Sequence, residues 1–461
     1  MPLTPVFLYA DQLLWLLVVI AAGYAWYCAT RPHLALPWKR VFQSKAAVIC
    51  TVVLGCFLVV GLADSLHFRL RLESTGAGNA PAYSPEVLSL LDAGLSSLRN
   101  RTERTYSAPL ATRLYAKEVV EIGAGPEAGK QVREYPRLKF GGSHLRSEDD
   151  RLGDIYARIG LGLVAAMILA VPIALAVRRL RRRDSTVPWR AAGGALVVIA
   201  ALALPVAFLA PYYHVLGTDK VGQDVLYLSL KSIRISLVVG TLTTLVLLPM
   251  AIGLGLAAGY FKGRVDDAVQ YVYTTINSIP GVLLIAASVL MMQVVMERHA
   301  DLFPTAAQRA DVKLLVLCAI LGLVSWTGLA RLLRGEALKL SQLEYIEAAQ
   351  AFGVADRRIL TRHLLPNVAH IVIISIVMDF SGFVLAEAVL SYIGVGVDPA
   401  TTSFGNMINA ARLEMGREPV VWWSLAAAFF FMFVLVLAAN LFADAVRDGF
   451  DPRVRIGGGR P

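Results

Sequence analysis

The chain has few cysteines, and their spacing suggests neither a disulfide nor a metal site. Its 461 residues include only four, Cys28, Cys50, Cys56 and Cys318, and each lies in an apolar run. Cys50 and Cys56 are six residues apart, so on one helix roughly 9 Å would separate them, too far for a disulfide. Buried, inert thiols are the expected state. We expect no metal site and no cofactor.

Motifs for catalysis and for nucleotide binding are also missing. The sequence contains no His-Glu-x-x-His, no serine nucleophile elbow and no aspartate pair at the spacing of an intramembrane protease. Gly129-Lys130 is similar to the end of a phosphate-binding loop. However, Ala124 stands where the first glycine belongs, and Gln131 replaces the required Ser or Thr. We therefore expect no catalytic residue: the chain is not an enzyme, and any ATP hydrolysis belongs to a partner.

Apolar residues, in contrast, are abundant. They make up 56% of the chain, and the mean hydropathy is +0.60, whereas soluble domains contain about 45–50%. The sequence therefore predicts an integral membrane protein in contact with lipid. The net charge of +10 could indicate nucleic-acid binding, but the basic residues cluster between apolar runs without interleaved aromatics. Such clusters are typical of cytoplasmic loops, so we expect no nucleic-acid partner.

Nine apolar runs are long enough to cross a bilayer, which takes about 20 residues. They are residues 10–28, 46–66, 155–177, 191–211, 235–258, 269–292, 313–333, 368–394 and 422–443. The first run has no basic start and no clear cleavage site, so we expect a retained span. If the loops that carry the clusters of basic residues lie on the cytoplasmic side, the N-terminus faces outward and the C-terminus faces the cytoplasm. The polar insert of residues 67–154 is then extracytoplasmic.

A polar segment between the seventh and eighth spans falls on the cytoplasmic side of this topology. Four residues at i, i+3, i+4 and i+7 predict one face of a short amphipathic helix: Tyr345, Ala348, Ala349 and Phe352. Gly353 follows where a helix C-cap favours a positive φ. We expect Asp356 to cap a second helix that runs to His363, and Leu365-Pro366 to break the chain before the next span.

This segment resembles the signature of permease subunits of ABC importers. The pattern is Glu-Ala-Ala, three residues, Gly and later Leu-Pro, and here it reads Glu347-Ala348-Ala349, Gly353 and Leu365-Pro366. His363 replaces an aliphatic residue, as in the oligopeptide/dipeptide and nickel branch. The resemblance implies a coupling helix that docks on a separate ATPase subunit. The residues implied in that contact are Glu344, Tyr345, Glu347, Ala348, Ala349, Phe352, Gly353, Asp356 and Arg358. An ordinary amphipathic connector is the alternative.

A second stretch, after the fourth span, also resembles this branch. It contains the Gly-Thr-Asp pattern at Gly217, Thr218, Asp219, Gly222 and Asp224, although Gln223 replaces the arginine of the family. From the residues alone, a turn in which Thr218 or Asp219 caps an interfacial helix is the alternative. The resemblance covers about residues 186–456, including a glycine-bearing turn at 259–266. The first three spans and the insert lie outside it.

Three polar residues and one proline inside the apolar runs are candidates for a translocation path: Asn277, Asp379, Glu387 and Pro280. Pro280 is expected to kink the sixth span, either to line the path or for packing alone. Asp379 and Glu387 stand in the eighth span. A carboxylate at the bilayer centre costs roughly 2.5–3.5 kcal/mol, so it normally faces a cavity or a partner. An ion pair with a partner subunit is the alternative to contact with substrate.

The predicted fold is an all-α polytopic membrane protein with a type I (MetI-like) permease core and extra N-terminal spans. Its segments are two spans in 1–66, the insert in 67–154, two further spans in 155–211 and the core in 212–456, with the coupling loop at about 334–367. The resemblance implies a bacterial inner-membrane permease, half of an ATP-driven importer of peptides or peptide-like solutes. The implied partners are a second permease, two ATPase subunits and an extracytoplasmic solute-binding protein.

Two questions stay open at this point. An ion- or proton-coupled secondary transporter is the alternative function, suggested by Asp379 and Glu387, although no internal repeat is visible. The insert could be a structural cap or an additional docking surface for the binding protein. The sequence does not indicate which solute is carried.

Overall fold

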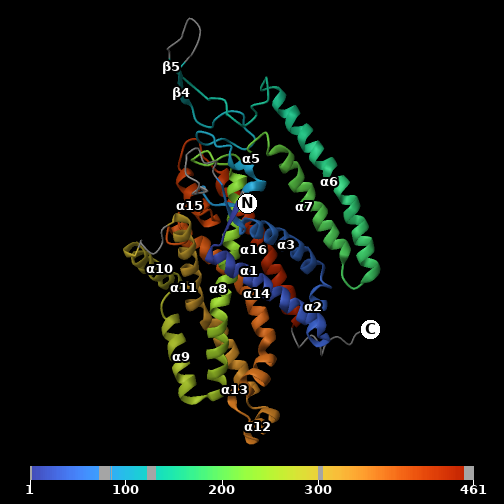
Figure 1. Cartoon of the computed structure of the whole chain (residues 1–461), viewed down its shortest axis with the longest axis vertical. Coiled ribbons are helices and arrows are strands. Elements are labelled where there is room, and N and C mark those ends of the chain that lie inside the picture. The colour runs from blue at the N-terminus through green and yellow to red at the C-terminus, as the bar shows by residue number, and fades with distance from the viewer. Residues whose placement is uncertain (1–2, 72–83, 85, 122–130, 300–304, 451–461) are drawn as a thin grey trace. The chain divides into compact units, whose positions relative to one another are not determined.

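The computed structural model describes residues 3–71, 84, 86–121, 131–299 and 305–450 (Figure 1). Gly129-Lys130 and the last residues of the predicted core lie outside this part. Nine of the described helices are long and apolar enough to cross a membrane, which confirms the predicted polytopic helical fold. They are α1 (Tyr9–Thr30), α3 (Lys45–Asp64), α6 (Asp150–Arg183), α7 (Trp189–Leu209), α8 (Val225–Phe261), α10 (Gly281–Arg298), α11 (Ala306–Leu340), α14 (Leu365–Ile393, continuous with the helical turns before it) and α16 (Trp423–Phe450).

Shorter elements connect these helices. The helical ones are α2 (Pro32–Val41), α4 (Leu90–Gly94), α5 (Ser96–Arg99), α9 (Gly263–Asn277), α12 (Glu344–Ala351), α13 (Asp356–Ile359), the π-helical turn η2 (Leu360–Leu364) and α15 (Phe404–Glu414). The strands are β1 (Leu3–Val6), β2 (His67–Leu70), β3 (Leu88–Ser89), β4 (Glu118–Glu121) and β5 (Gln131–Glu134). The chain divides into a first unit (residues 1–6, 42–235 and 402–435) and a second unit (7–41, 236–401 and 436–461).

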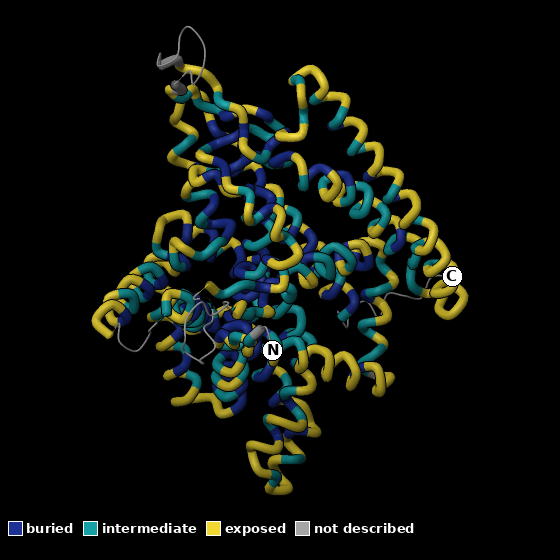
Figure 2. Tube along the Cα trace, turned by 45° about the horizontal axis from the view of Figure 1, so that its top comes forward, coloured by how far each residue is buried: buried dark blue, intermediate teal, exposed yellow. Residues whose placement is uncertain are grey.

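In the first unit, α6 and α7 pack along each other as a hairpin, and α3 packs against α7. A Cβ at Gly162 would lie 2.5 Å from the Cα of Pro205, so the absence of a side chain permits the close approach of α6 and α7. Most apolar side chains of α6 are exposed (Figure 2), as expected for a helix that faces lipid. The insert contains ordered structure: its strands β2 and β3 form an antiparallel sheet with β1 from the start of the chain, in which Pro5 pairs with Phe68.

In the second unit, α11 contributes several large side chains to the buried core. Leu317, Leu321, Trp326 and Leu333 are almost completely buried, and α11 packs against α10 and α14. Glycines bring it close to α8: a Cβ at Gly255 would lie 2.7 Å from the carbonyl oxygen of Ala330, and one at Gly259 would lie 2.5 Å from the Cβ of Ala337.

The first span is fixed to this core. The backbone N–H of Tyr9 donates to Asp311 Oδ2 at 2.8 Å, and the N–H of Ala10 lies 3.3 Å from the same oxygen. A carboxylate from α11 thus satisfies free N–H groups at the start of α1 and complements the positive end of the helix dipole. The N-terminal span is therefore integrated into the second unit rather than appended to it.

Two predicted spans have different limits in the structure. The sixth is not one kinked helix over 269–292: α9 ends at Asn277, and α10 begins at Gly281 with Pro280 at its N-cap. Because proline has no N–H, it suits a helix start better than a helix interior. The expected break at Leu365-Pro366 is also absent, since helical backbone continues from Asp356 to Ile393. The wider π-helical turn η2 ends at Leu364, two residues before Pro366, whose N–H is missing.

Candidate functional site

The segment between α11 and α14 is built around the short helix α12. Glu344 and Glu347 lie in its first turn, where carboxylates favour the positive end of the helix dipole. At the other end, Gly353 has φ +72°, as predicted. The N–H of Gly353 donates to Gln350 O at 2.9 Å, and the N–H of Val354 donates to Ala349 O at 3.0 Å. These two bonds define a Schellman motif, which stops the helix and redirects the chain into α13.

The loop has a buried side that anchors it. Ile346 of α12, Ile359 of α13 and Leu364 of η2 are each 0% exposed. Burial of three large aliphatic side chains contributes roughly 1.5–3 kcal/mol for each residue. The loop is thus held firmly against the second unit.

The opposite side of α12 is open. Tyr345 is 46% exposed and Phe352 is 87% exposed, and Ala348 is also exposed, whereas Ala349 is half-buried. The yellow part of the trace in Figure 2 includes most of α12. The predicted face therefore exists, and it points away from the chain's own core. An exposed aromatic of this size on an anchored helix is typical of a protein-docking surface.

Asp356 has a different role from the one predicted. The N-cap of α13 is Ala355, and the Asp356 side chain makes no capping bond. Instead, its Oδ1 accepts a hydrogen bond of 2.7 Å from the hydroxyl of Tyr260, at the end of α8. The start of α13 is thereby joined to α8. Arg358, on the same turn, is exposed.

A second link joins α9 to α11. The guanidinium of Arg334 binds the carboxylate of Asp266 through Nε and Nη2, and the distance from Nη2 to Oδ2 is 2.6 Å. Hydrogen bonding to Arg334 lowers the pKa of Asp266. Neither this pair nor Tyr260 was identified as functional from the sequence. The glycine-bearing turn at 259–266 contains two of these residues, but no local pattern indicates their partners.

His363, the residue that departs from the general signature, packs beside Tyr345 on the exposed side of α12. Its ring centroid lies 6.3 Å from that of Tyr345. Asn367 connects the two residues: its Nδ2 donates to the Tyr345 hydroxyl at 3.1 Å and to the His363 carbonyl at 2.7 Å. The orientation of Tyr345 is therefore fixed from α14.

The predicted path residues lie in different environments. Asn277 and Pro280 are exposed, and Asn277 Oδ1 accepts a hydrogen bond of 3.1 Å from Thr327. Glu387 is 0% exposed, and its Oε1 accepts a hydrogen bond of 2.7 Å from Ser391 one turn later. Asp379 is half-buried. Glu387 thus has a structural partner within its own helix.

The Gly-Thr-Asp stretch in the first unit contacts the insert. Gly217 and Gly222 have φ of +74° and +79°. A Cβ at Gly222 would lie 2.0 Å from the Glu103 carbonyl oxygen, so only glycine fits. Thr218 Oγ1 donates to Thr105 O at 2.9 Å and accepts from Ser107 N–H at 2.7 Å.

Helix α8 begins just after this stretch. Asp224 Oδ1 accepts the N–H of Leu226 at 2.9 Å, so Asp224, and neither Thr218 nor Asp219, starts the helix. Asp219 instead closes its own turn by accepting the N–H of Gln223 at 2.8 Å.

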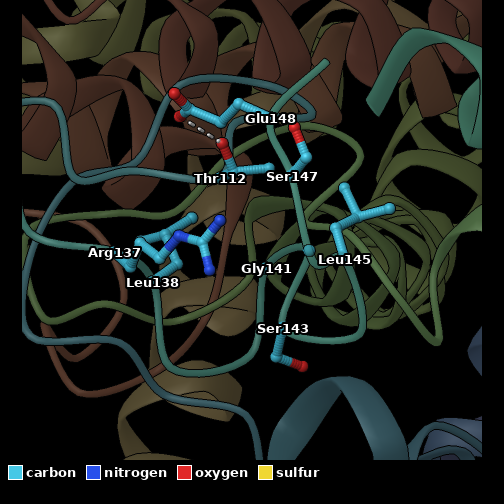
Figure 3. A pocket seen from close by; sticks show the side chains of 9 residues that line it. Thr112, Arg137, Leu138, Gly141, Ser143, Leu145, Ser147 and Glu148 are labelled. Carbon is cyan, nitrogen blue, oxygen red and sulfur yellow. Dashed lines mark hydrogen bonds between the residues drawn. The ribbon is translucent and has the colours of Figure 1, made fainter. Parts of the chain in front are cut away.

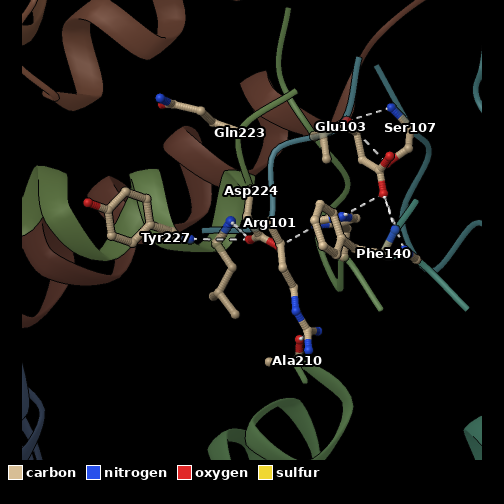
Figure 4. A network of polar contacts seen from close by, with 12 residues as sticks. Arg101, Glu103, Ser107, Phe140, Ala210, Gln223, Asp224 and Tyr227 are labelled. Carbon is tan, nitrogen blue, oxygen red and sulfur yellow. Dashed lines mark hydrogen bonds and ion pairs between the residues drawn. The ribbon is translucent and has the colours of Figure 1, made fainter. Parts of the chain in front are cut away.

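A buried charged triad strengthens the contact between the insert and this stretch (Figure 4). His214 Nδ1 lies 2.8 Å from Asp224 Oδ2, and His214 Nε2 lies 3.5 Å from Glu103 Oε1. Burial alone would lower the pKa of His214, but Asp224 and Glu103 outweigh it and raise that pKa to about 9. Burial would likewise raise the pKa of Glu103, but His214 and the backbone N–H groups of residues 139–141 lower it to about 2. The histidine is therefore charged at neutral pH.

A small pocket lies in the insert (Figure 3), with a volume of about 140 Å³. Its lining is Thr112, Arg137, Leu138, Gly141, Gly142, Ser143, Leu145, Ser147 and Glu148. This volume equals that of about five water molecules, so the pocket cannot be a chamber for a peptide. Glu148 on its wall is paired with Arg113 at 2.7 Å. Among the residues the structure describes, no group of His, Cys, Asp and Glu is arranged to hold a metal ion.

The described part of the chain thus combines nine helices long enough to cross a membrane with a short, anchored helix that exposes aromatic side chains. A family model described as binding-protein-dependent transport system inner membrane component matches residues 251–456. The chain belongs to this family, the inner-membrane permease subunits of ABC importers, and is not itself an enzyme. Family membership favours this class over an ion-coupled secondary transporter.

The relatives belong to the peptide branch. The glutathione transport system permease protein GsiD of Pectobacterium atrosepticum is 30% identical over 322 residues, 63% of this chain and 97% of the relative. The oligopeptide transport system permease protein OppC of Mycobacterium tuberculosis is 32% identical over 242 residues, 52% of this chain and 77% of the relative. The dipeptide transport system permease protein DppC of Lactococcus lactis is 29% identical over 240 residues, which are 52% of this chain and 64% of the relative.

Proposed function

We propose that this chain forms half of the translocation path of an ATP-driven importer for peptides or peptide-like solutes. A second permease forms the other half, two ATPase subunits bind on the cytoplasmic side, and a solute-binding protein delivers cargo from outside. The substrate class is supported by the names of the relatives, which carry oligopeptides, dipeptides or glutathione. The observation that carries the mechanism is α12, which exposes Tyr345, Ala348 and Phe352 while Ile346 anchors it in the core.

The coupling mechanism follows from how this loop is connected. The contact surface consists of the residues predicted from the signature: Glu344, Tyr345, Glu347, Ala348, Ala349, Phe352, Gly353, Asp356 and Arg358. When the ATPase dimer closes, it displaces α12. The buried side chains of Ile346, Ile359 and Leu364 transmit this displacement, because a packed core resists compression.

Helix continuity carries the motion into the membrane. The 38 residues from Asp356 to Ile393 are helical without interruption, a rod of roughly 57 Å. The bond from Tyr260 to Asp356 links the base of this rod to α8, and the Arg334–Asp266 pair links α9 to α11. Several spanning helices therefore receive the same movement, which opens the path alternately to the two sides.

The insert acts as a structural cap at the outer ends of the spans in this proposal. Its support is the network from Glu103, Thr105 and Ser107 to the Gly-Thr-Asp stretch, which fixes the insert to the start of α8. In the predicted topology this junction is extracytoplasmic. The contact between the insert and the start of α8 is also compatible with a docking surface for the binding protein on the outer side of the insert.

The proposal is tested by placing a charge on the docking face. Phe352→Asp should leave expression and melting temperature unchanged, because the side chain is 87% exposed. It should abolish co-purification of the ATPase subunits and reduce peptide uptake at least tenfold. Leu413→Asp, at a site that is 73% exposed on α15, is the matched control and should retain the ATPase. Normal ATPase binding and uptake by the Phe352 variant would refute the assignment of the loop.

A further inference from the structure

We propose that Asp379 binds the α-ammonium group of the transported solute midway along the path. The permease itself then favours solutes with a free amino terminus. The inference rests on the proposed import of peptides and adds a residue that selects among them.

The first argument is position. Asp379 lies fourteen residues after Leu365 and fourteen before Ile393 in α14. At 1.5 Å per residue it is about 21 Å from either end of the helix. A carboxylate at this depth is held far from both aqueous phases, so it needs a cation, a proton or a water-filled cavity.

The second argument concerns the cations on the described helices α8, α11 and α14 of the second unit. Neither α14 nor the α8 residues of this unit include a Lys or Arg. Three cations on α11 have other partners: Lys313 binds Asp398 at 3.0 Å, Arg334 binds Asp266, and Arg331 lies over the ring of Tyr273.

The Asp379 carboxylate itself makes no hydrogen bond or ion pair with any residue of its unit that the structure describes. Glu387, on the same helix, shows the contrast, since it is fully buried and bonded to Ser391. The chain thus provides a partner for one carboxylate and leaves the other for an external group.

The third argument is access. Asp379 is half-buried rather than enclosed. Three residues one or two turns away on the same face of α14 are small, namely Ser375, Gly382 and Ala386, although Ile376 and Phe383 also belong to this face. Gly382 is exposed, whereas Phe383, at i+4 on the same side, is buried against the chain, and Val384 is buried on another side of the helix. An elongated solute can therefore approach the carboxylate along the exposed side of Gly382, where no side chain covers the helix.

The chemistry selects the ligand. Every linear peptide with an unmodified amino terminus carries an ammonium group, whatever its sequence, so one carboxylate can serve many peptides. A charge-assisted hydrogen bond in a site with little water is strong. Asp379 also belongs to the continuous helical segment that begins at Asp356. Movement of the docking loop would therefore move the carboxylate and change its distance from the bound solute.

The test uses the complete importer in proteoliposomes and two forms of one tripeptide, with a free and with an acetylated amino terminus. Uptake of both is measured for the native chain, Asp379→Asn, Asp379→Glu and, as the control, Asp448→Asn, which changes an exposed carboxylate of α16. Because the same binding protein is present throughout, its own preference cancels when variants are compared.

The inference predicts that Asp379→Asn reduces uptake of the free peptide about tenfold or more and leaves uptake of the acetylated peptide unchanged. The variant thereby loses the permease's own preference for the free peptide over the acetylated one. Asp379→Glu should retain most of this preference for the free peptide, and Asp448→Asn should retain all of it. Unchanged discrimination in Asp379→Asn would overturn the inference while leaving peptide import intact. Equal loss of both peptides with loss of the second permease on purification would also overturn it, because Asp379 would then be an interface ion pair. A native importer that transports neither peptide would refute the proposed function and the inference together.

Discussion

Replacement of Gly353 tests the coupling loop most sharply, because its effect comes from the backbone alone. With φ +72°, Gly353 adopts the left-handed conformation that closes α12. A Cβ added there meets no atom within 4 Å, so no clash within this chain contributes. A residue with a side chain loses roughly 1–2 kcal/mol in this conformation, and Asn loses less. Helix α12 has only eight residues, too few to be stable without its cap and its anchors.

The size of the effect on coupling follows from this loss of free energy. A loss of 1–2 kcal/mol reduces the population of the capped loop by a factor of about 5 to 30. The ATPase then meets a frayed helix, and its closure no longer displaces the rod that begins at Asp356. We expect peptide uptake per ATP hydrolysed to decrease in the order Gly, Asn, Ala, Val at position 353. The assay is parallel measurement of uptake and stimulated ATP hydrolysis in proteoliposomes.

The control is Gly335→Ala. Gly335 lies within α11 and also has free space at its Cβ position, so alanine should stabilise that helix by about 1 kcal/mol and leave coupling unchanged. Equal coupling for Gly, Ala and Val at position 353 would refute the hinge. If Asn were as damaging as Val, the cause would be steric exclusion by the ATPase rather than backbone strain.

Three further outcomes follow from the contacts. Arg334→Met should destabilise the chain by roughly 2–4 kcal/mol because it leaves the Asp266 carboxylate unpaired, and Asp266→Asn in the same chain should recover much of that loss in a melting assay. Tyr260→Phe should cost about 1 kcal/mol and lower uptake per ATP hydrolysed by loosening Asp356; unchanged coupling would count against this link. The pKa of His214 is raised to about 9, against an ordinary value near 6.5. The charged histidine therefore adds roughly 3 kcal/mol to the free energy of unfolding. This contribution is complete below pH 6.5 and is lost as the pH rises through 9. Protease resistance of the insert should fall over that range, and His214→Gln should show a lower, flat profile; an identical pH profile in both would contradict the role of the charged histidine.

The coupling loop was largely predictable because its signals are local. The periodicity of Tyr345, Ala348 and Phe352 and the position of Gly353 each depend on neighbours within one or two turns. The same local reasoning failed at two prolines. Pro280 starts a helix instead of kinking one, and Pro366 lies within continuous helical backbone because a π-helical turn precedes it. A proline indicates a missing N–H, but whether the chain breaks, begins or widens there depends on the surrounding packing.

The sequence by itself determined that the chain crosses the membrane and that a short amphipathic helix ending at Gly353 follows the seventh span, because hydropathy and helical periodicity are properties of consecutive residues. Only the tertiary structure decided the partners of the charged and polar groups. Tyr260 and Asp356 are 96 residues apart, and Asp266 and Arg334 are 68 apart. Such pairs form because helices distant in sequence become neighbours, and no local pattern records which helices do. For the same reason, only the structure separates Glu387, which has a partner in Ser391, from Asp379, which has none within the described part of its unit.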